Sequence, residues 1–82
     1  MIFLIEYNRP VGHIVTFKIF AETDRARAED ARLAIELDLH RRKIEHEVVL
    51  LEASSEQALR RTHRRYFEDP GEILKSATGL TE

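Results

Sequence analysis

Residues 1–5, Met1-Ile2-Phe3-Leu4-Ile5, form an unbroken apolar run that ends at Glu6. The run is too short for a signal peptide or for a helix that crosses a bilayer. We interpret it as the first buried strand of the fold. We therefore expect a protein that does not enter the membrane and that is located in the cytoplasm.

A second strand-like segment, residues 11–20, follows the turn-forming residues Asn8-Arg9-Pro10. Asn tolerates positive φ, while Pro presets φ and cannot donate to a strand ladder, so the two segments are expected to form a β-hairpin. Residues 24–40 contain no Gly or Pro and are rich in Ala, Leu, Glu and Arg. This composition predicts a long helix with Thr23 or Asp24 as its N-cap.

Residues 44–53 predict a third strand with Val48-Val49-Leu50-Leu51 at its centre. Ser54 and Gln57 have the spacing of a capping box, which predicts a second helix that begins there and reaches about residue 67. Asp69-Pro70-Gly71 would end it. We expect a single domain over residues 1–75 and a frayed tail over residues 76–82.

The resulting order of elements is ββαβα, which predicts the α+β class. With the first strand between the other two, a right-handed crossover gives a three-stranded, mainly antiparallel sheet, and we expect both helices on one face of it. Residues 51–60, LEASSEQALR, are similar to the strand-to-helix turns of ferredoxin-like domains. The resemblance covers this short segment and implies a partial ferredoxin-like sandwich, but no function, because that fold has many.

Composition excludes several function classes. The chain has 82 residues, of which 43% are hydrophobic and 34% charged, and its formal net charge is −2. These values are typical of one globular domain and not of a protein that coats nucleic acid through bulk charge. There is no cysteine, so disulfides, thiolate nucleophiles and cysteine-ligated metal sites are excluded. We expect neither a metal nor a cofactor.

Alternation along the predicted strands sorts their residues into two faces. One set is almost wholly apolar and is expected to lie under the helices: Phe3, Ile5, Tyr7, His13, Val15, Phe17, Ile19, Ile44, His46, Val48 and Leu50. The other set mixes apolar with charged residues: Ile2, Leu4, Glu6, Ile14, Thr16, Lys18, Phe20, Glu45, Glu47, Val49 and Leu51.

The predicted long helix has two apolar ridges, one with Ala26, Leu33 and Leu37 and the other with Ala28, Ala31, Ile35 and Leu39. An ordinary surface helix needs only one. Together with the mixed sheet face, this excess of apolar surface predicts a two-fold homodimer. The interface is expected to use apolar residues of the mixed face and of the first ridge: Ile2, Leu4, Ile14, Val49, Leu51, Leu33 and Leu37. A wide core-facing arc with a few exposed alanines is the alternative explanation.

The outer arc of the predicted second helix carries four arginines: Arg60, Arg61, Arg64 and Arg65. Clustered guanidinium groups are typical of contacts with phosphate, so this arc is a candidate site for nucleic acid or a small anion. Acidic residues four positions away, such as Glu56 before Arg60, also explain the cluster as a solvated face with helical ion pairs.

His13 and His46 fall in the apolar set, together with Tyr7. Two imidazoles in a core can pair, hold a metal or act as acid–base groups, so we consider a small pocket near these three residues. No third metal ligand stands at a recognisable spacing. A packed histidine satisfied by one hydrogen bond explains the same pattern.

These features favour a non-catalytic, homodimeric binding or regulatory domain whose partner is a protein or a small anionic ligand. The first alternative is a nucleic-acid-binding domain that uses the arginines of the second helix. The second alternative is a small enzyme or metal-binding protein with its site near His13 and His46. No nucleophile motif and no phosphate-binding glycine loop supports an enzyme.

Overall fold

The computed structural model describes residues 1–67, and the predicted domain end at residue 75 and the predicted tail 76–82 lie outside them. The strands are β1 (Ile2–Asn8), β2 (His13–Phe20) and β3 (Glu47–Glu52). The helices are α1 (Arg25–Arg42) and α2 (Glu56–Thr62), with the short 3-10 turns η1 (Glu22–Asp24) before α1 and η2 (Arg64–Tyr66) after α2. Within this range, neither helix has the length and apolar character that a membrane crossing requires.

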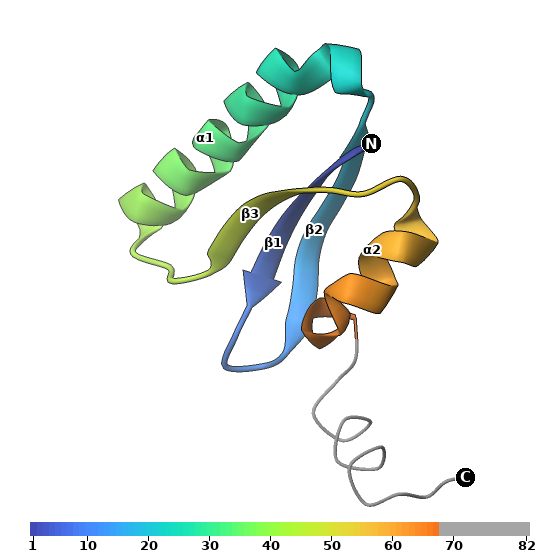
Figure 1. Ribbon diagram of the computed structural model, residues 1–82. Helices are drawn as coiled ribbons and strands as arrows, with labels where there is room; N and C mark the ends of the chain where they lie inside the picture. Colours follow the sequence, from blue (N-terminus) through green and yellow to red (C-terminus); the bar gives the residue numbers. More distant parts are fainter. Residues whose placement is uncertain (68–82) are drawn as a thin grey trace, which may run out of the picture.

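The strands form one antiparallel sheet in the predicted order β2-β1-β3 (Figure 1). The turn between β1 and β2 is closed by a hydrogen bond of 2.8 Å from the Gly12 N–H to the Asn8 carbonyl oxygen. Gly12 has a φ of 79°, which a residue without a Cβ adopts at little cost. β3 pairs with the free side of β1, so β1 is the central strand. The α+β class and the strand order are confirmed.

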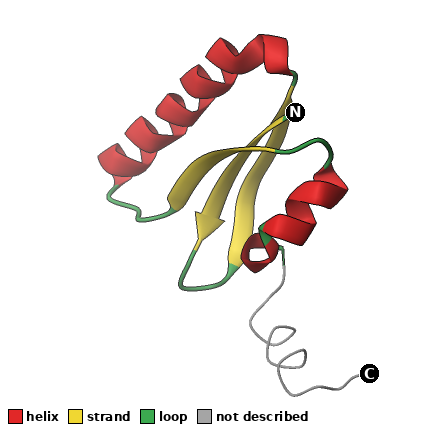
Figure 2. Cartoon of the chain, viewed as in Figure 1, coloured by secondary structure: helices red, strands yellow, loops and turns green. Residues whose placement is uncertain are grey.

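The central strand is buried on both of its faces, because residues 2–7 are all buried. α1 covers the face with Leu4 and Glu6, which we call the α1 face. α2 and η2 cover the face with Phe3 and Ile5, which we call the α2 face. Figure 2 shows the two helices on either side of the sheet. The prediction that both helices lie on one face is therefore wrong: a strand without polar alternation needs cover on both sides.

The register between β1 and β3 also differs from the predicted faces. Val49 lies opposite Ile5 and Leu51 lies opposite Phe3, and residues paired in this way point to the same side of a sheet. Val49 and Leu51 therefore belong to the α2 face, whereas the predicted alternation puts them on the face of Glu6. A tight turn fixes the register of a hairpin, but no such turn joins β1 to β3.

The core of the α2 face is a cluster of aromatic and aliphatic side chains: Phe3, Ile5, Tyr7, Leu59 and Tyr66. The rings of Tyr7 and Tyr66 meet edge to face, with centroids 5.1 Å apart, and Phe17 stacks on Phe3 at 5.9 Å. Aromatic pairs of this kind contribute about 0.5–1.5 kcal/mol each beyond the burial of their area. The cluster fixes α2 and η2 against the sheet.

α1 buries one of its two apolar ridges and exposes the other. Ala28 and Leu39 are buried, whereas Leu33 and Leu37 are exposed. The buried side is the one that faces the sheet. Both ridges expected from the sequence therefore exist, and only one of them is covered by the described part of the chain.

The caps of the helices differ from the prediction. Ser55 caps α2, because its side-chain oxygen accepts a hydrogen bond of 3.0 Å from the N–H three residues further on. The capping box predicted for Ser54 and Gln57 is therefore wrong by one residue. α2 ends at Thr62, earlier than predicted, and η2 follows it. Asp24 precedes α1 as predicted, but its side chain caps no backbone N–H.

Replacing Ala28 with a larger residue tests the placement of α1. Ala28 has no exposed surface, so Ala28→Leu should overpack this side of the sheet and lower the free energy of unfolding by about 1–3 kcal/mol. Ala26→Leu, at an exposed position of the same helix, is the matched control and should not lower that free energy by more than about 0.5 kcal/mol. Urea unfolding measures both, and equal losses would contradict the described packing.

Candidate functional site

A pocket of about 330 Å³ lies between α1 and the sheet. Its apolar wall comes from β2, from α1 and from the segment before β3: Val15, Ala34, Ile35, Leu39 and Ile44. Four polar residues complete the lining: Glu6, Asp38, Arg42 and His46. Sites for small ligands are mostly apolar, contain a few converging polar groups and begin at about this volume.

Glu6 is the buried charge of this pocket. It belongs to the central strand, is 7% exposed, and has one partner for each carboxylate oxygen. The Thr16 hydroxyl donates to Oε1 at 2.8 Å, and Oε2 lies 2.7 Å from Nδ1 of His46. A buried carboxylate is costly unless its oxygens are hydrogen-bonded. The hydrogen bonds from Thr16 and His46 therefore offset the free-energy cost of burying the Glu6 carboxylate.

A β-bulge in β2 places Thr16 beside Glu6. Glu6 pairs with Thr16, but Tyr7 pairs with Ile14, so Val15 is an extra residue without a partner in β1. The extra residue shifts, by one position, the alternation of β2 side chains between the two faces of the sheet. As a result Ile14 shares the α2 face with Tyr7, whereas the predicted alternation puts it with Glu6. Val15 becomes part of the pocket wall.

His46 lines the pocket and contacts Glu6 through one of its ring nitrogens. A carboxylate accepts and does not donate, so Nδ1 carries the hydrogen of the bond to Glu6. The other nitrogen, Nε2, forms no hydrogen bond within residues 1–67, and the His46 side chain is 15% exposed and lines the pocket. A carboxylate on one nitrogen orients the ring and leaves the other nitrogen for a ligand or for proton transfer.

Asp38 and Arg42 form the charged rim of the pocket. Nη1 of Arg42 donates to Oδ2 of Asp38 at 2.9 Å, and Arg41 lies 3.5 Å from Oδ1. Both carboxylates of the pocket, those of Glu6 and Asp38, thus already have partners. The remaining hydrogen-bonding capacity belongs to the other N–H groups of Arg42 and to Nε2 of His46. The guanidinium suits an anion, whereas Nε2 donates to one only when both ring nitrogens carry a hydrogen.

The structure does not bring His13, His46 and Tyr7 together. His13 is exposed at the start of β2, and His46 lies on the α1 face beside Glu6. Tyr7 points to the α2 face, where its hydroxyl donates to the Arg65 carbonyl oxygen at 3.1 Å. The predicted three-residue pocket is therefore wrong, because β1 separates Tyr7 from His46. In the described chain, no group of three or more His, Asp and Glu side chains is arranged to hold a metal ion.

The structure gives separate surroundings to the four arginines considered for anion binding: Arg60, Arg61, Arg64 and Arg65. Arg60 donates to Glu56 from Nε at 3.0 Å and from Nη2 at 2.8 Å. Arg65 donates to Glu47 at 2.7 Å. The other two are exposed. Carboxylates thus neutralise the charges of Arg60 and Arg65, in the manner of the solvated face that the sequence offers as the alternative.

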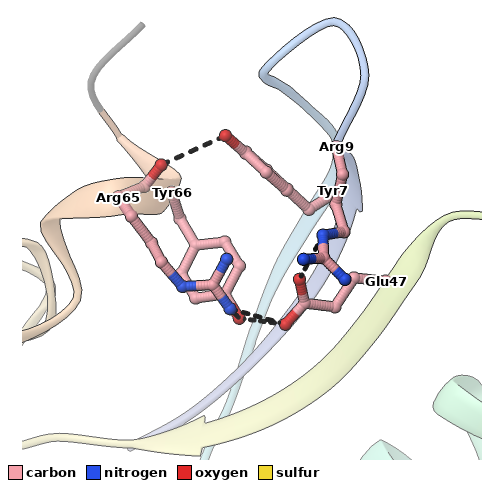
Figure 3. A network of polar contacts seen from close by, with 5 residues as sticks. All are labelled: Tyr7, Arg9, Glu47, Arg65 and Tyr66. Carbon is pink, nitrogen blue, oxygen red and sulfur yellow. Dashed lines mark hydrogen bonds and ion pairs between the residues drawn. The ribbon is translucent and has the colours of Figure 1, made fainter. Parts of the chain in front are cut away.

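Figure 3 shows the network of polar contacts that fastens η2 to the sheet. Oε2 of Glu47 accepts hydrogen bonds from the Tyr66 hydroxyl at 2.5 Å and from Arg65 at 2.7 Å, and Arg9 lies 4.0 Å from Oε1. The hydrogen bond from Tyr66, followed by the one from Arg65, holds the pKa of Glu47 below its usual value against the effect of burial. Burial and the hydrogen bond to Glu47 raise the pKa of Tyr66 to about 12.

Five of the residues predicted for the dimer interface lie inside the fold: Ile2, Leu4, Ile14, Val49 and Leu51. The first two are fully buried on the α1 face, and the other three pack against the core cluster of the α2 face. Ile2 and Leu4 have no exposed surface, so their assignment to an interface is wrong. Ile14, Val49 and Leu51 are partly buried, and their assignment stays a prediction. Leu33 and Leu37 remain exposed on α1.

No protein-family model, curated protein or solved structure matches this chain.

Sequence reasoning missed three polar residues of the pocket, Glu6, Asp38 and Arg42, and also Thr16, which is the hydrogen-bond partner of Glu6. Only Glu6 has a signal in the sequence, because it is the single charge within the buried strand. The place of Thr16 depends on a bulge. Asp38 and Arg42 have the four-residue spacing of any helical ion pair.

Removal of the imidazole should leave the Glu6 carboxylate short of a partner. We expect His46→Ala to lower the free energy of unfolding by about 1–3 kcal/mol, and by less in a Glu6→Gln background that has no buried charge. His13→Ala, at an exposed histidine, is the control and should change that free energy by less than about 0.5 kcal/mol. Urea unfolding checks this, and equal losses in both backgrounds would show that Glu6 and His46 are not coupled.

Tyr66 can be titrated alone, because the chain has two tyrosines and Tyr7→Phe removes the other. The tyrosinate absorbance of this variant should have its midpoint near 12, and adding Glu47→Gln should move the midpoint toward the ordinary value of about 10. A pKa raised in the folded state adds stability below about pH 10, and this is lost as the pH rises to about 12. A midpoint near 10 without the Glu47 substitution would contradict the network.

Proposed function

We propose that the chain is a small, non-catalytic binding domain that takes a small anionic ligand into the pocket beneath α1 and acts as a homodimer. The supporting observation is that His46 and Arg42 border one apolar-walled pocket whose carboxylates already have partners. Of the two kinds of partner expected from the sequence, the small anion therefore has the better support. A regulatory role and a cytoplasmic location belong to the same proposal.

The ligand that suits this chemistry is a short carboxylic acid with an apolar body. Its planar carboxylate would accept a hydrogen bond from the fork of the Arg42 guanidinium, and a second one from Nε2 of His46 when both nitrogens of that ring carry a hydrogen. Its apolar body would contact Ile35, Leu39 and Ile44, which line the same pocket. The volume of about 330 Å³ limits the ligand to a small molecule.

Acid–base catalysis is the second candidate, and the pairing of Glu6 with His46 supports it. An imidazole that is oriented by a carboxylate and open at its other nitrogen is the arrangement of many general bases. Among the described residues that line the pocket, however, none carries a hydroxyl or amine nucleophile. Binding therefore has the stronger support.

Nucleic-acid binding through α2 and η2 is the other alternative and has less support. Arg60 and Arg65, two of the four arginines on which it depends, are paired with Glu56 and Glu47. Both faces of the sheet are covered by helices, so neither is open for bases to stack on.

Titration with small acids tests the proposed ligand class. Hexanoate or benzoate should shift the amide resonances of α1 and of residues 44–46 in ¹⁵N-resolved NMR spectra, with a Kd on the order of 1 mM. Arg42→Gln should weaken binding about tenfold, since it removes one charge-assisted hydrogen bond. Arg27→Gln, which makes the same charge change elsewhere on α1, is the control. Equal binding of the neutral amides hexanamide and benzamide would contradict the proposal.

A further inference from the structure

We infer that a second copy of this chain packs on the outward face of α1. The α1 helices of the two copies would run antiparallel about a two-fold axis that passes near Leu33 and Leu37. The inference deepens the self-association included in the proposed function. It rests on α1 alone and not on the pocket, so the two can fail separately.

The outward face of α1 carries apolar side chains at its centre. Leu33 is 52% exposed and Leu37 is 57% exposed, and Ala26 lies seven residues before Leu33 on the same face. This face points directly away from Ala28 and Leu39, which are buried against the sheet. Figure 1 shows α1 at the outside of the molecule, with the sheet on one side of it. Apolar residues in the middle of a solvated helix face are typical of an interaction surface.

The charges beside these leucines change sign along α1. Glu29 and Asp30 precede them, and His40 and Arg41 follow them. Neither acidic residue forms an ion pair within residues 1–67. Arg41 lies 3.5 Å from Asp38 and is still largely exposed. The outward face therefore has an acidic end, an apolar centre and a basic end.

This order of charges selects the orientation of the second copy. In an antiparallel pair, Leu33 lies beside the partner's Leu37, Asp30 beside the partner's Arg41, and Glu29 beside the partner's His40. In a parallel pair, each end would instead meet a copy with the same charge, which opposes association. The antiparallel pair is also self-complementary, as a two-fold axis requires.

The size of the surface sets the expected strength of the dimer. One pair of helices buries less than the roughly 1,200 Å² of most stable interfaces, so the dimer should be weak, with a Kd on the order of 10–100 μM. Association at this strength depends on the concentration of the protein.

Sedimentation equilibrium of the whole chain tests the surface. The mass should rise from 9.6 kDa toward twice that value as the concentration passes through the Kd. Leu37→Glu should raise the Kd at least tenfold without changing the helical circular dichroism, because Leu37 is exposed. Val11→Glu is the matched control, since Val11 is 55% exposed in the hairpin turn, away from α1. It should leave the Kd unchanged.

Disulfide trapping tests the orientation, and the absence of native cysteine gives it a clean background. When Leu33→Cys and Leu37→Cys variants are mixed under mild oxidation, the mixed disulfide should form faster than either homodimeric one. Faster homodimeric disulfides would overturn the antiparallel arrangement. A dimer that Leu37→Glu leaves intact would overturn this interface but not self-association. A monomer at every concentration would overturn both, and ligand binding in the pocket would be unaffected.

Discussion

The burial of β1 on both faces is the constraint on which the rest of the structure depends. Residues 2–7 have β2 on one side, β3 on the other, α1 over one face and α2 with η2 over the opposite face. A charge inside such a strand must be satisfied by its neighbours, because the desolvation of an unpaired carboxylate costs more than a small core can offset. Glu6 therefore requires both Thr16, brought beside it by the bulge, and His46, which directly precedes β3. The candidate site follows from this requirement.

Much of the fold could be predicted from the sequence because its signals are local. The β-branched and aromatic segments gave the three strands, the run without Gly or Pro gave α1, and the two apolar ridges of α1 are both present. The two faces of the sheet could not be predicted. Residues 2–5 are uniformly apolar and carry no alternation, and β1 and β3 are joined through α1, so no turn fixes their register. Val49 and Leu51 were assigned to the wrong face for this reason.

The polar sites were harder to predict, because each depends on partners that are far apart in the sequence. Glu6 is 40 residues from His46, and Glu47 is 18 residues from Arg65. Spacing rules apply within one helix or strand, so they recovered the pair of Glu56 and Arg60 and missed the others. The bulge at Val15 shifts the alternation by one residue and has no signature in the sequence. The sequence therefore shows which polar residues the chain has, but it does not predict which residues they contact in the fold.

The place of β1 in the chain has a consequence for synthesis of the protein. β1 leaves the ribosome before every element that covers it, and the last of these, η2, ends at Tyr66. At about 5–20 residues per second, some 60 residues of further translation take roughly 3–12 s. During that time neither face of β1 is covered by a helix, and the edge of β1 that later pairs with β3 is open. Exposed apolar surface and open strand edges are features that chaperones bind and that lead to aggregation. β1 is the central strand of the finished domain, and until α1, β3, α2 and η2 have formed around it, it favours aggregation of the nascent chain.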